Sequence, residues 1–559
     1  MRFDSNHFQQ QTSQGMIHKF FLILFVCSSI NITAQTPPSV DSLRGGNGSG
    51  RSTWNLLHYD ITVKPDFSTK TINGSCSIRF EDNGVQKMQI DLQEPMMIDS
   101  VIFNESPLSF KREGNVYWIT PAREKDVTLV KTYQLYFHGK PRIAAMPPWD
   151  GGWIWNKDRR GNPFVSVACQ GLGASVWYPC KDIQSDEPDQ GCNLRIIAPD
   201  TLSAVGNGKL KQTIDNHDGT KTWVWEVKNP INNYNIIPYI GKYNHFGEKY
   251  KGIKGWLDCD YWVLDYNVDV AKKQFKEVPR MLKAFEYWMG PYPFYEDGYK
   301  LVEAPHLGME HQSSIAYGNG YMNGYRGNDL SGSGWGKKWD FIIVHESGHE
   351  WFGNNITTKD IADMWVHEGF TTYSEVLFTE YYYGKMAGEA YVQGLRQNID
   401  NDKNIIGQYG INNEGSGDMY SKGANLIHTI RQIINNDKKF RSIVVGMNKQ
   451  FYHQTVTSEQ VERYLSQQVG FDLSKIFDQY LRTTQIPELR FMSVGKNKIN
   501  AWWTNCVDGF NLPVKLKSGN GKYKWVKPDT NVQQFNINAA VSTISMDPNF
   551  YARLRYFVP

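Results

Sequence analysis

Hydrophobic and polar residues alternate over a long stretch of the chain that begins after residue 52. Segments such as HYDITVKPD (58–66) and GSCSIRFED (74–82) have apolar residues at every second position, and Gly, Asn, Asp or Pro separate them. Side chains of a β-strand point alternately to two faces, so this period is typical of half-buried strands. The signals continue to IIPYIGKYNHF (236–246). They predict a β-rich first domain over residues 53–248.

The period changes near residue 266. Apolar residues now recur three and four positions apart in DVAKKQFKEVPRMLKAFEYWMG (269–290) and in KKWDFIIVHESGHEWFG (337–353), and each ends at a Gly. That spacing is typical of amphipathic helices, with Gly353 and Asn354 as a C-terminal cap of the second. Further helices are expected over 362–384, 419–435, 458–470 and 473–483, and short strands return after Pro487. The pattern predicts a mostly helical catalytic-type domain over 249–486 and a small β-rich segment over 487–559.

The first 34 residues have the form of a secretory signal. Lys19 precedes an unbroken apolar run over residues 20–26, and small residues near Ala34 suit a cleavage site. The run is too short for a spanning helix of about 20 apolar residues, and we expect no integral membrane span. Val26 does not fit the position before a lipidated Cys27. We therefore expect export to the periplasm or the medium, without lipid anchoring at Cys27, and a Gly/Ser-rich linker over residues 35–52.

Composition excludes few functions but points away from polyanionic partners. Hydrophobic residues make up 40% of the 559 residues and charged residues 21%, as in ordinary soluble proteins. The formal net charge is only +3, so we expect no nucleic-acid partner. The 7 cysteines form no CxxC pair. Cys180 and Cys192 could pair in an oxidising compartment, and buried free thiols are an equally good interpretation.

The stretch FIIVHESGHEWFGNN (341–355) carries the clearest chemistry. Residues four apart share one face of a helix, so His345 and His349 can bind one metal ion. Glu346 is rotated by roughly 100° about the helix axis, which places it beside the metal as a base rather than a ligand. Two histidines and a glutamate in this pattern are expected by chance in about 1% of such chains. Glu368, with 18 residues between it and His349, is the expected third ligand of a catalytic zinc that keeps one open position.

The longer sequence VHESGHEWFGNNITTKDIADMWVHEGF resembles the zinc signature of the M1 family of metallo-aminopeptidases, the gluzincins related to aminopeptidase N and leukotriene A4 hydrolase. HLGMEHQSS (306–314), MYSKGANLIH (419–428) and ACQGLGASVWYPCKD (168–182) resemble further family segments. This resemblance implies a multidomain α+β fold: a β-rich N-terminal saddle domain, a thermolysin-like, mostly helical catalytic domain and a small β-rich C-terminal segment. It implies one Zn²⁺ per chain and peptide substrates with a free N-terminus.

The resemblance also implies roles for individual residues. Tyr420 would stabilise the oxyanion, and Glu310 and Gln170 would bind the substrate's α-ammonium group, with Gly308 and Met309 along the substrate backbone. His311 stands where the family usually has Asn, and a protonated imidazole there would repel the ammonium group. Asp363 is open to two interpretations, a partner of a ligand imidazole or a solvated helix start.

The function expected from these residues is zinc-dependent removal of the N-terminal residue from peptides, with Glu346 and Tyr420 as catalytic groups. Two alternatives stay open at this point. One is an epoxide hydrolase-like activity, which occurs in the same family, and the other is a catalytically decayed homologue that only binds peptides. The large helical C-terminal domain of many relatives is missing from the expected organisation.

Overall fold

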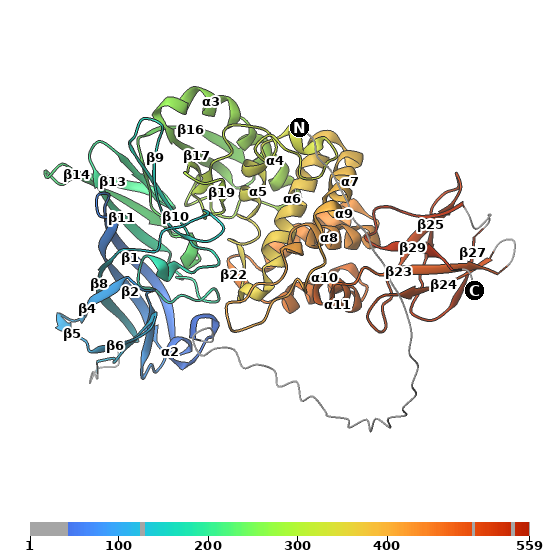
Figure 1. Cartoon of the computed structure of the whole chain (residues 1–559), viewed down its shortest axis with the longest axis horizontal. Coiled ribbons are helices and arrows are strands. Elements are labelled where there is room, and N and C mark those ends of the chain that lie inside the picture. The colour runs from blue at the N-terminus through green and yellow to red at the C-terminus, as the bar shows by residue number, and fades with distance from the viewer. Residues whose placement is uncertain (1–42, 123–128, 495–497, 538–542, 558–559) are drawn as a thin grey trace, which may run out of the picture. The chain divides into compact units, whose positions relative to one another are not determined.

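A computed structural model describes residues 43–122, 129–494, 498–537 and 543–557. The expected signal segment and Cys27 lie outside these residues. The multidomain α+β organisation predicted from the sequence is confirmed: strands dominate the first region, helices the middle and strands the end (Figure 1).

The first region contains an eight-stranded sheet in the order β13-β14-β11-β1-β2-β8-β4-β5. Its long strands follow the alternating pattern: in β1, Tyr59, Ile61 and Val63 are fully buried while the residues between them are partly exposed. Each such burial contributes roughly 1.5–3 kcal/mol. The sheet comprises β1 (Trp54–Asp66), β2 (Thr71–Asp82), β4 (Met97–Phe103), β5 (Ser106–Pro107), β8 (Val130–Gly139), β11 (Cys192–Pro199), β13 (Lys209–Asp215) and β14 (Thr220–Val227).

Two smaller sheets complete this region. The strands are β3 (Met88–Asp91), β6 (Phe110–Glu113) and β7 (Val116–Ile119) in one sheet, and β9 (Gly152–Lys157), β10 (Pro163–Ala168), β12 (Ser203–Val205) and β15 (Tyr239–Gly241) in the other. Strand β10 leads directly into the loop that carries Gln170, so the second of these sheets positions that residue.

The middle region begins with a five-stranded sheet, β16-β17-β18-β20-β19. The short strand β19 lies at its edge and pairs only with β20, with Gly308 opposite Tyr317. This sheet therefore places the GMEH segment at a free edge. Its strands are β16 (Tyr243–Gly252), β17 (Gly255–Leu264), β18 (Tyr299–Glu303), β19 (Gly308–Met309) and β20 (Ile315–Tyr317), and a two-stranded sheet pairs β21 (Ile356–Thr358) with β22 (Gln454–Val456).

Helices make up the rest of the middle region, and α6 is their centre, because it packs against α4, α5, α7 and α8. Figure 1 shows these helices in green to orange. The helices are α3 (Val268–Gln274), α4 (Glu277–Met289), α5 (Phe341–Gly348), α6 (Trp365–Tyr383), α7 (Lys385–Gly394), α8 (Ser421–Ile434), α9 (Asp437–Gln450), α10 (Ser458–Val469) and α11 (Ser474–Arg482).

Two expected helices differ in extent. The segment 269–290 forms two helices with a break at Phe275, whose backbone N–H bonds Ala271 O at 2.8 Å and ends α3. In the segment 337–353 the α-helix covers only α5, and the first two residues end a short 3-10 helix, Trp335–Lys338. Beyond Gly348 the backbone turns through i to i−3 bonds, such as Trp351 N to Gly348 O at 3.1 Å. His349 is therefore the C-cap of α5 and not an interior residue.

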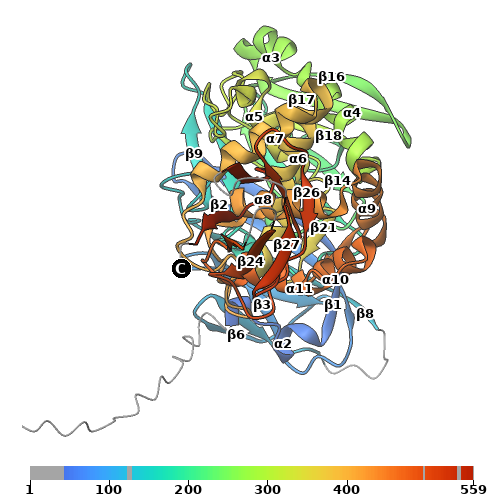
Figure 2. The same cartoon turned by 90° about the vertical axis from the view of Figure 1, so that its right-hand side faces the viewer.

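The C-terminal strands pack on the helical region and share its hydrophobic core, which includes Leu489, Trp503 and Phe550. A turn near the end of the chain makes polar contacts as well: Tyr551 N bonds Thr429 Oγ1 on α8 at 3.3 Å. These strands face the viewer in Figure 2 and are β23 (Glu488–Ser493), β24 (Lys498–Thr504), β25 (Val514–Ser518), β26 (Lys524–Val526), β27 (Gln533–Asn536), β28 (Ile544–Met546) and β29 (Arg553–Tyr556).

Two further observations concern membranes and thiols. Within the described ranges, no helix has the length and apolar character needed to cross a membrane. The six cysteines that the structure describes are all free, so the pairing of Cys180 with Cys192 is not formed. Both thiols are buried, and burial raises the pKa of each, which keeps them protonated.

Candidate metal centre

The helix α5 that carries the first histidine is fixed at its start. The carboxylate of Asp340, the N-cap residue, accepts bonds from Ile342 N and Ile343 N at 3.1 and 3.3 Å. Such a cap satisfies N–H groups that would otherwise lack partners. Every residue of α5 is buried, so the position of His345 is determined by packing on all sides.

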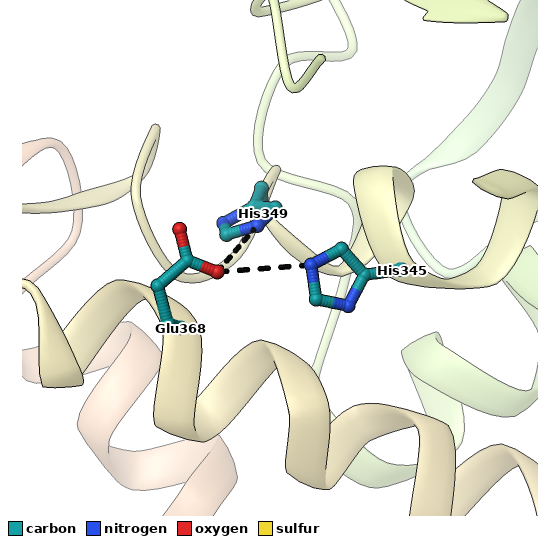
Figure 3. A group of neighbouring side chains, drawn as sticks. All are labelled: His345, His349 and Glu368. Carbon is teal, nitrogen blue, oxygen red and sulfur yellow. Dashed lines mark ion pairs between the residues drawn. The ribbon is translucent and has the colours of Figure 1, made fainter. Parts of the chain in front are cut away.

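The two histidines and Glu368 converge as the spacing predicts (Figure 3). Glu368 lies in the first turn of α6, and its Oε2 atom is 3.7 Å from His345 Nε2 and 3.3 Å from His349 Nε2. Ligand atoms at about 2.0–2.2 Å from a tetrahedral zinc lie roughly 3.4 Å from one another. Glu368 Oε2 is also buried with no hydrogen-bond partner among the described residues. The three residues fit a zinc ion that leaves one position open.

Other groups orient the two imidazole rings. His345 Nδ1 lies 2.7 Å from Glu375 Oε1, and His349 Nδ1 lies 3.0 Å from Phe352 O. Each bond places the proton on Nδ1 and leaves Nε2 free to bind the metal. Tyr391 OH donates to the second oxygen of Glu375 at 2.6 Å.

Glu375 was missed by the sequence interpretation, although a signal existed. It follows Glu368 by seven residues on α6, which places both carboxylates on the same face of that helix. Asp363, the residue considered for this role, instead accepts bonds from Tyr409 OH at 2.6 Å and Ser458 N at 2.9 Å. It therefore joins helix α10 to the start of α6 and does not contact a ligand imidazole.

Glu346 lies beside the ligands as expected. Burial raises the pKa of its carboxyl to about 7, against the opposing effect of the two ligand histidines. A pKa in this range suits a group that accepts and returns a proton near neutrality. A Cβ atom on Gly308 would lie 2.6 Å from Glu346 Oε1. A larger residue at 308 would therefore displace the carboxylate of Glu346 or the side chain of Ile342.

The GMEH segment and the first domain meet at Glu310, which is 3% exposed. Its Oε1 atom accepts a bond from Gln170 Nε2 at 2.6 Å and one from Tyr234 OH at 3.0 Å. The side-chain amide of Gln170 therefore donates to Glu310 with its nitrogen. Asn354 Nδ2 donates to Glu310 O at 2.9 Å and ties the segment to the turn after α5. Tyr234 was not predicted, because nothing in its local sequence distinguishes it, and Asn354 was predicted as part of a helix cap and not as a partner of Glu310.

His311 lies behind this segment. It is fully buried, its Nδ1 atom lies 2.5 Å from Tyr239 OH, and it does not line the cleft. Burial lowers the pKa of His311 well below its ordinary value. The expectation that a protonated imidazole at 311 would repel the substrate's ammonium group is therefore wrong, because this ring stays neutral.

Tyr420 immediately precedes α8, and its ring stacks on that of His345 with centroids 6.1 Å apart. The residue is 37% exposed, since one face of the ring borders the open cleft. Tyr420 lines the cleft, where desolvation and the negative charges of Glu368 and Glu310 raise its pKa well above the ordinary value. It is therefore a hydrogen-bond donor over the physiological pH range.

The candidate metal ligands and Glu346 border one cleft of about 570 Å³. Its polar lining contains the carboxylates of Glu310, Glu346, Glu368, Glu375 and Glu414, and no Lys or Arg side chain from the described parts of the chain. Gln170, Met309 and Tyr420 line it as well. Other histidines near the motifs have different partners: His367 Nε2 accepts from Thr358 N at 2.8 Å, and His428 bonds Tyr373 and Asn549.

This arrangement defines a class of protein. A buried site of two histidines and one carboxylate, with a further glutamate beside it and an open cleft above it, is typical of zinc-dependent hydrolases.

Comparisons with known proteins agree and narrow the class. Residues 274–480 match the peptidase family M1 domain. Leukotriene A-4 hydrolase of Xenopus laevis is 22% identical over 452 residues, which cover 74% of this chain and 68% of that protein. Leucine aminopeptidase 2 of Vanderwaltozyma polyspora is 21% identical over 444 residues, covering 74% of this chain and 62% of that protein. The chain therefore spans about two thirds of the length of these relatives.

A solved structure shares the fold. The crystal structure of an M1 zinc metallopeptidase variant from Deinococcus radiodurans, bound to a Tyr-Ser-Ala substrate, has a TM-score of 0.64 at 18% identity and covers 78% of this chain and 95% of that one. Residues 274–480 therefore match the peptidase family M1 domain, and the chain shares the fold of an M1 zinc metallopeptidase.

Proposed function

We propose that the chain is an aminopeptidase that removes the N-terminal residue from peptides. The observation that carries this proposal is the short distance between the candidate amine site and the metal ligands. Side-chain ligand atoms of Glu310, Glu346 and His349 all lie within 4.8 Å of one another. An α-nitrogen lies only about 2.5 Å from the carbonyl carbon of its own residue. A peptide whose ammonium group contacts Glu310 would therefore present its first carbonyl to the metal.

The residues around the site supply the steps of such a reaction. Zinc held by His345, His349 and Glu368 would polarise the scissile carbonyl and lower the pKa of water. Glu346 takes a proton from the attacking water and delivers it to the leaving amine. Tyr420 donates a hydrogen bond to the oxygen on which negative charge develops. Glu310 and the amide oxygen of Gln170 accept hydrogen bonds from the ammonium group, which needs such partners once it is desolvated.

The free edge of β19 supports the same orientation. Strand β19 pairs with β20 on one side only, so Gly308 and Met309 can offer backbone groups to an extended substrate. Addition of a peptide strand to an open sheet edge is a common mode of peptide binding.

The test compares a free tripeptide with its N-acetylated twin. The wild type should cleave the free peptide and leave the twin largely intact, and Glu310→Ala should raise KM for the free peptide. Glu414→Gln is a matched control, because this carboxylate borders the same cleft away from the Gln170–Glu310 contact. Comparable cleavage of both peptides would exclude amine anchoring.

Two other outcomes would support the alternative functions. Turnover of an epoxide without turnover of peptides would support the epoxide hydrolase alternative, and zinc binding without either activity would support the decayed homologue.

We further propose that the protein is exported, on the basis of Lys19, the apolar run at 20–26 and the small residues near Ala34. N-terminal sequencing of mature protein should start shortly after Ala34. A mature chain that begins at Met1 or Met16 would contradict export.

A further inference from the structure

The Gly/Ser-rich segment before the first strand, predicted as a linker, is packed against the protein over residues 43–52. We call these residues the N-terminal strap. Arg51 is fully buried, and its guanidinium bonds Asp91 Oδ2 at 2.6 Å. The same group donates to Arg44 O at 2.9 Å and to Gly46 O at 2.8 Å, so the strap folds back on itself. The strap also begins on the first domain, because Gln89 Nε2 donates to Leu43 O at 3.0 Å.

The side chain of Arg44 reaches the loop that carries Gln170. Its Nη2 atom donates to Gly171 O at 2.6 Å and also to Leu172 O. Two other side chains bond the same carbonyls: Gln93 Nε2 donates to Leu172 O at 2.8 Å, and Asn412 Nδ2 donates to Gly171 O at 3.1 Å. The loop is therefore fixed through its backbone by three donors from three separate segments.

The loop needs such external donors. Its sequence, Gln-Gly-Leu-Gly, places a glycine directly after Gln170, and a Cβ on Gly171 would meet no atom within 4 Å. A glycine without packed neighbours leaves the backbone with many accessible conformations. The planar guanidinium group of arginine can bond two acceptors at once, which restricts the orientation of a loop more than a single donor does.

The strap also contacts the loop that precedes α8. A Cβ atom on Gly45 would lie 2.1 Å from Asn412 N and 2.6 Å from Ile411 N. This close packing places the strap against the segment that leads to Glu414 and Tyr420. One short segment thus touches the loop of Gln170 in the first domain and the loop before α8 in the catalytic domain.

We propose that Arg44 is a positioning residue for substrate binding: it fixes the loop at Gly171 and Leu172 so that Gln170 stays bonded to Glu310 with its amide oxygen turned to the substrate's ammonium group. This proposal rests on the proposed aminopeptidase function. It gives the strap a role in the reaction although no strap residue lines the cleft around the metal.

The experiment is a double-mutant cycle in the full, zinc-loaded enzyme. Arg44→Ala should raise KM for a free tripeptide by about fivefold to tenfold, the range expected for lost hydrogen bonds, with kcat changed less than about twofold. Arg44→Lys, which can bond one carbonyl, should restore part of the loss. In a Gln170→Ala background, Arg44→Ala should change KM less than about twofold, because both act through one contact. Arg112→Ala, which removes a similar bond to Gly114 O on the first domain, is the matched control and should behave as wild type.

A second readout does not depend on activity. Hydrogen exchange of the peptide covering 169–176 should be faster in Arg44→Ala than in wild type or Arg112→Ala, with exchange across α5 and α6 unchanged. The proposal would be overturned if Arg44→Ala changed neither KM nor hydrogen exchange. It would also be overturned if Arg44→Ala raised KM equally in the wild-type and the Gln170→Ala backgrounds. If the wild type cleaves free and acetylated peptides alike, the aminopeptidase proposal fails. If the wild type cleaves only the free peptide but the KM values of the variants do not change as expected, only the role of Arg44 is contradicted.

Discussion

Two pairs of buried histidines, His345 with His349 and His306 with His311, have opposite properties. His345 and His349 bond a carboxylate and a backbone carbonyl through Nδ1, and their Nε2 atoms meet Glu368. His306 Nε2 lies 3.2 Å from Ser166 Oγ and His311 Nδ1 lies 2.5 Å from Tyr239 OH, so each of these rings bonds a hydroxyl and not a carboxylate.

The difference shows that the partners of an imidazole decide its chemistry. Burial alone lowers the pKa of a histidine, and it does so at His306, to about 4, and at His311. At His345 the carboxylates of Glu368 and Glu375 overcome burial and raise the pKa well above the ordinary value. Negative charge that favours a proton also favours a metal cation. The first pair is therefore suited to zinc, and the second is suited to holding the GMEH segment in place as neutral rings.

Breaking the first pair should have the largest effect. His349→Ala removes one of three ligands, so the variant should lose both its zinc and its activity. Glu346→Gln removes the base but no ligand, so it should lower kcat by about 10²–10⁴ and keep about one zinc per chain. Metal analysis of dialysed protein and peptide kinetics measure the two effects. Near-normal turnover in Glu346→Gln would contradict the assignment of the base.

The next largest effect on activity is expected for Tyr420→Phe. It removes a donor that acts on the transition state, which typically costs about 10²–10³ in kcat, with little change in KM. Zinc content should stay at the wild-type level, since Tyr420 is not a ligand. A raised KM with unchanged kcat would instead place Tyr420 in the binding of the ground state.

A smaller effect is expected when the carboxylate behind His345 is neutralised. Glu375→Gln should weaken zinc binding by about 10–100-fold, because an amide polarises the imidazole less than a carboxylate does. Ser166→Ala, which removes the partner of His306, is the control and should leave zinc affinity unchanged. Competition with a chelator measures both. Equal zinc affinities in Glu375→Gln and Ser166→Ala would contradict the view that the carboxylate partner makes the first histidine pair suited to zinc.

Much of this organisation could be predicted from the sequence because it depends on local periodicity. Alternation gave the strands of the first domain, and the i, i+4 spacing brought His345 and His349 to one point. The spacing also predicted Glu368 as the third candidate ligand, and the structure places it in the first turn of α6, after strand β21 and a short 3-10 helix. The boundaries were less predictable: α5 ends at Gly348, where bonds to i−3 replace those to i−4.

Features that depend on distant contacts could not be predicted. Glycine and serine gave residues 44–52 the composition of a linker, and only the folded chain shows Arg51 bonded to Asp91. Tyr234 reaches Glu310 across 76 positions of sequence, and nothing nearby indicates it. Such contacts form between elements whose relative position the local pattern does not determine.

The smallest effect is expected at the second pair and concerns stability rather than turnover. Because the folded state lowers the pKa of His311, the unfolded chain binds a proton there more readily once the pH falls below the unfolded value of about 6.5. Wild-type stability should therefore decline below that pH by up to about 1.4 kcal/mol per pH unit from this group alone, and His311→Asn should lack that part of the decline. We expect the Tm of His311→Asn to lie below that of wild type at pH 7.5, where packing and the bond to Tyr239 are lost, and the gap to narrow toward pH 5. His217→Asn, at a side chain that is 88% exposed, is the control, and its Tm should show the same pH dependence as that of wild type.

The KM of His311→Asn for a free tripeptide should follow the wild-type pH dependence, since a neutral, buried ring places no charge near the ammonium group. A KM that rises at acid pH in wild type but not in the variant would show that His311 does become protonated in the folded enzyme.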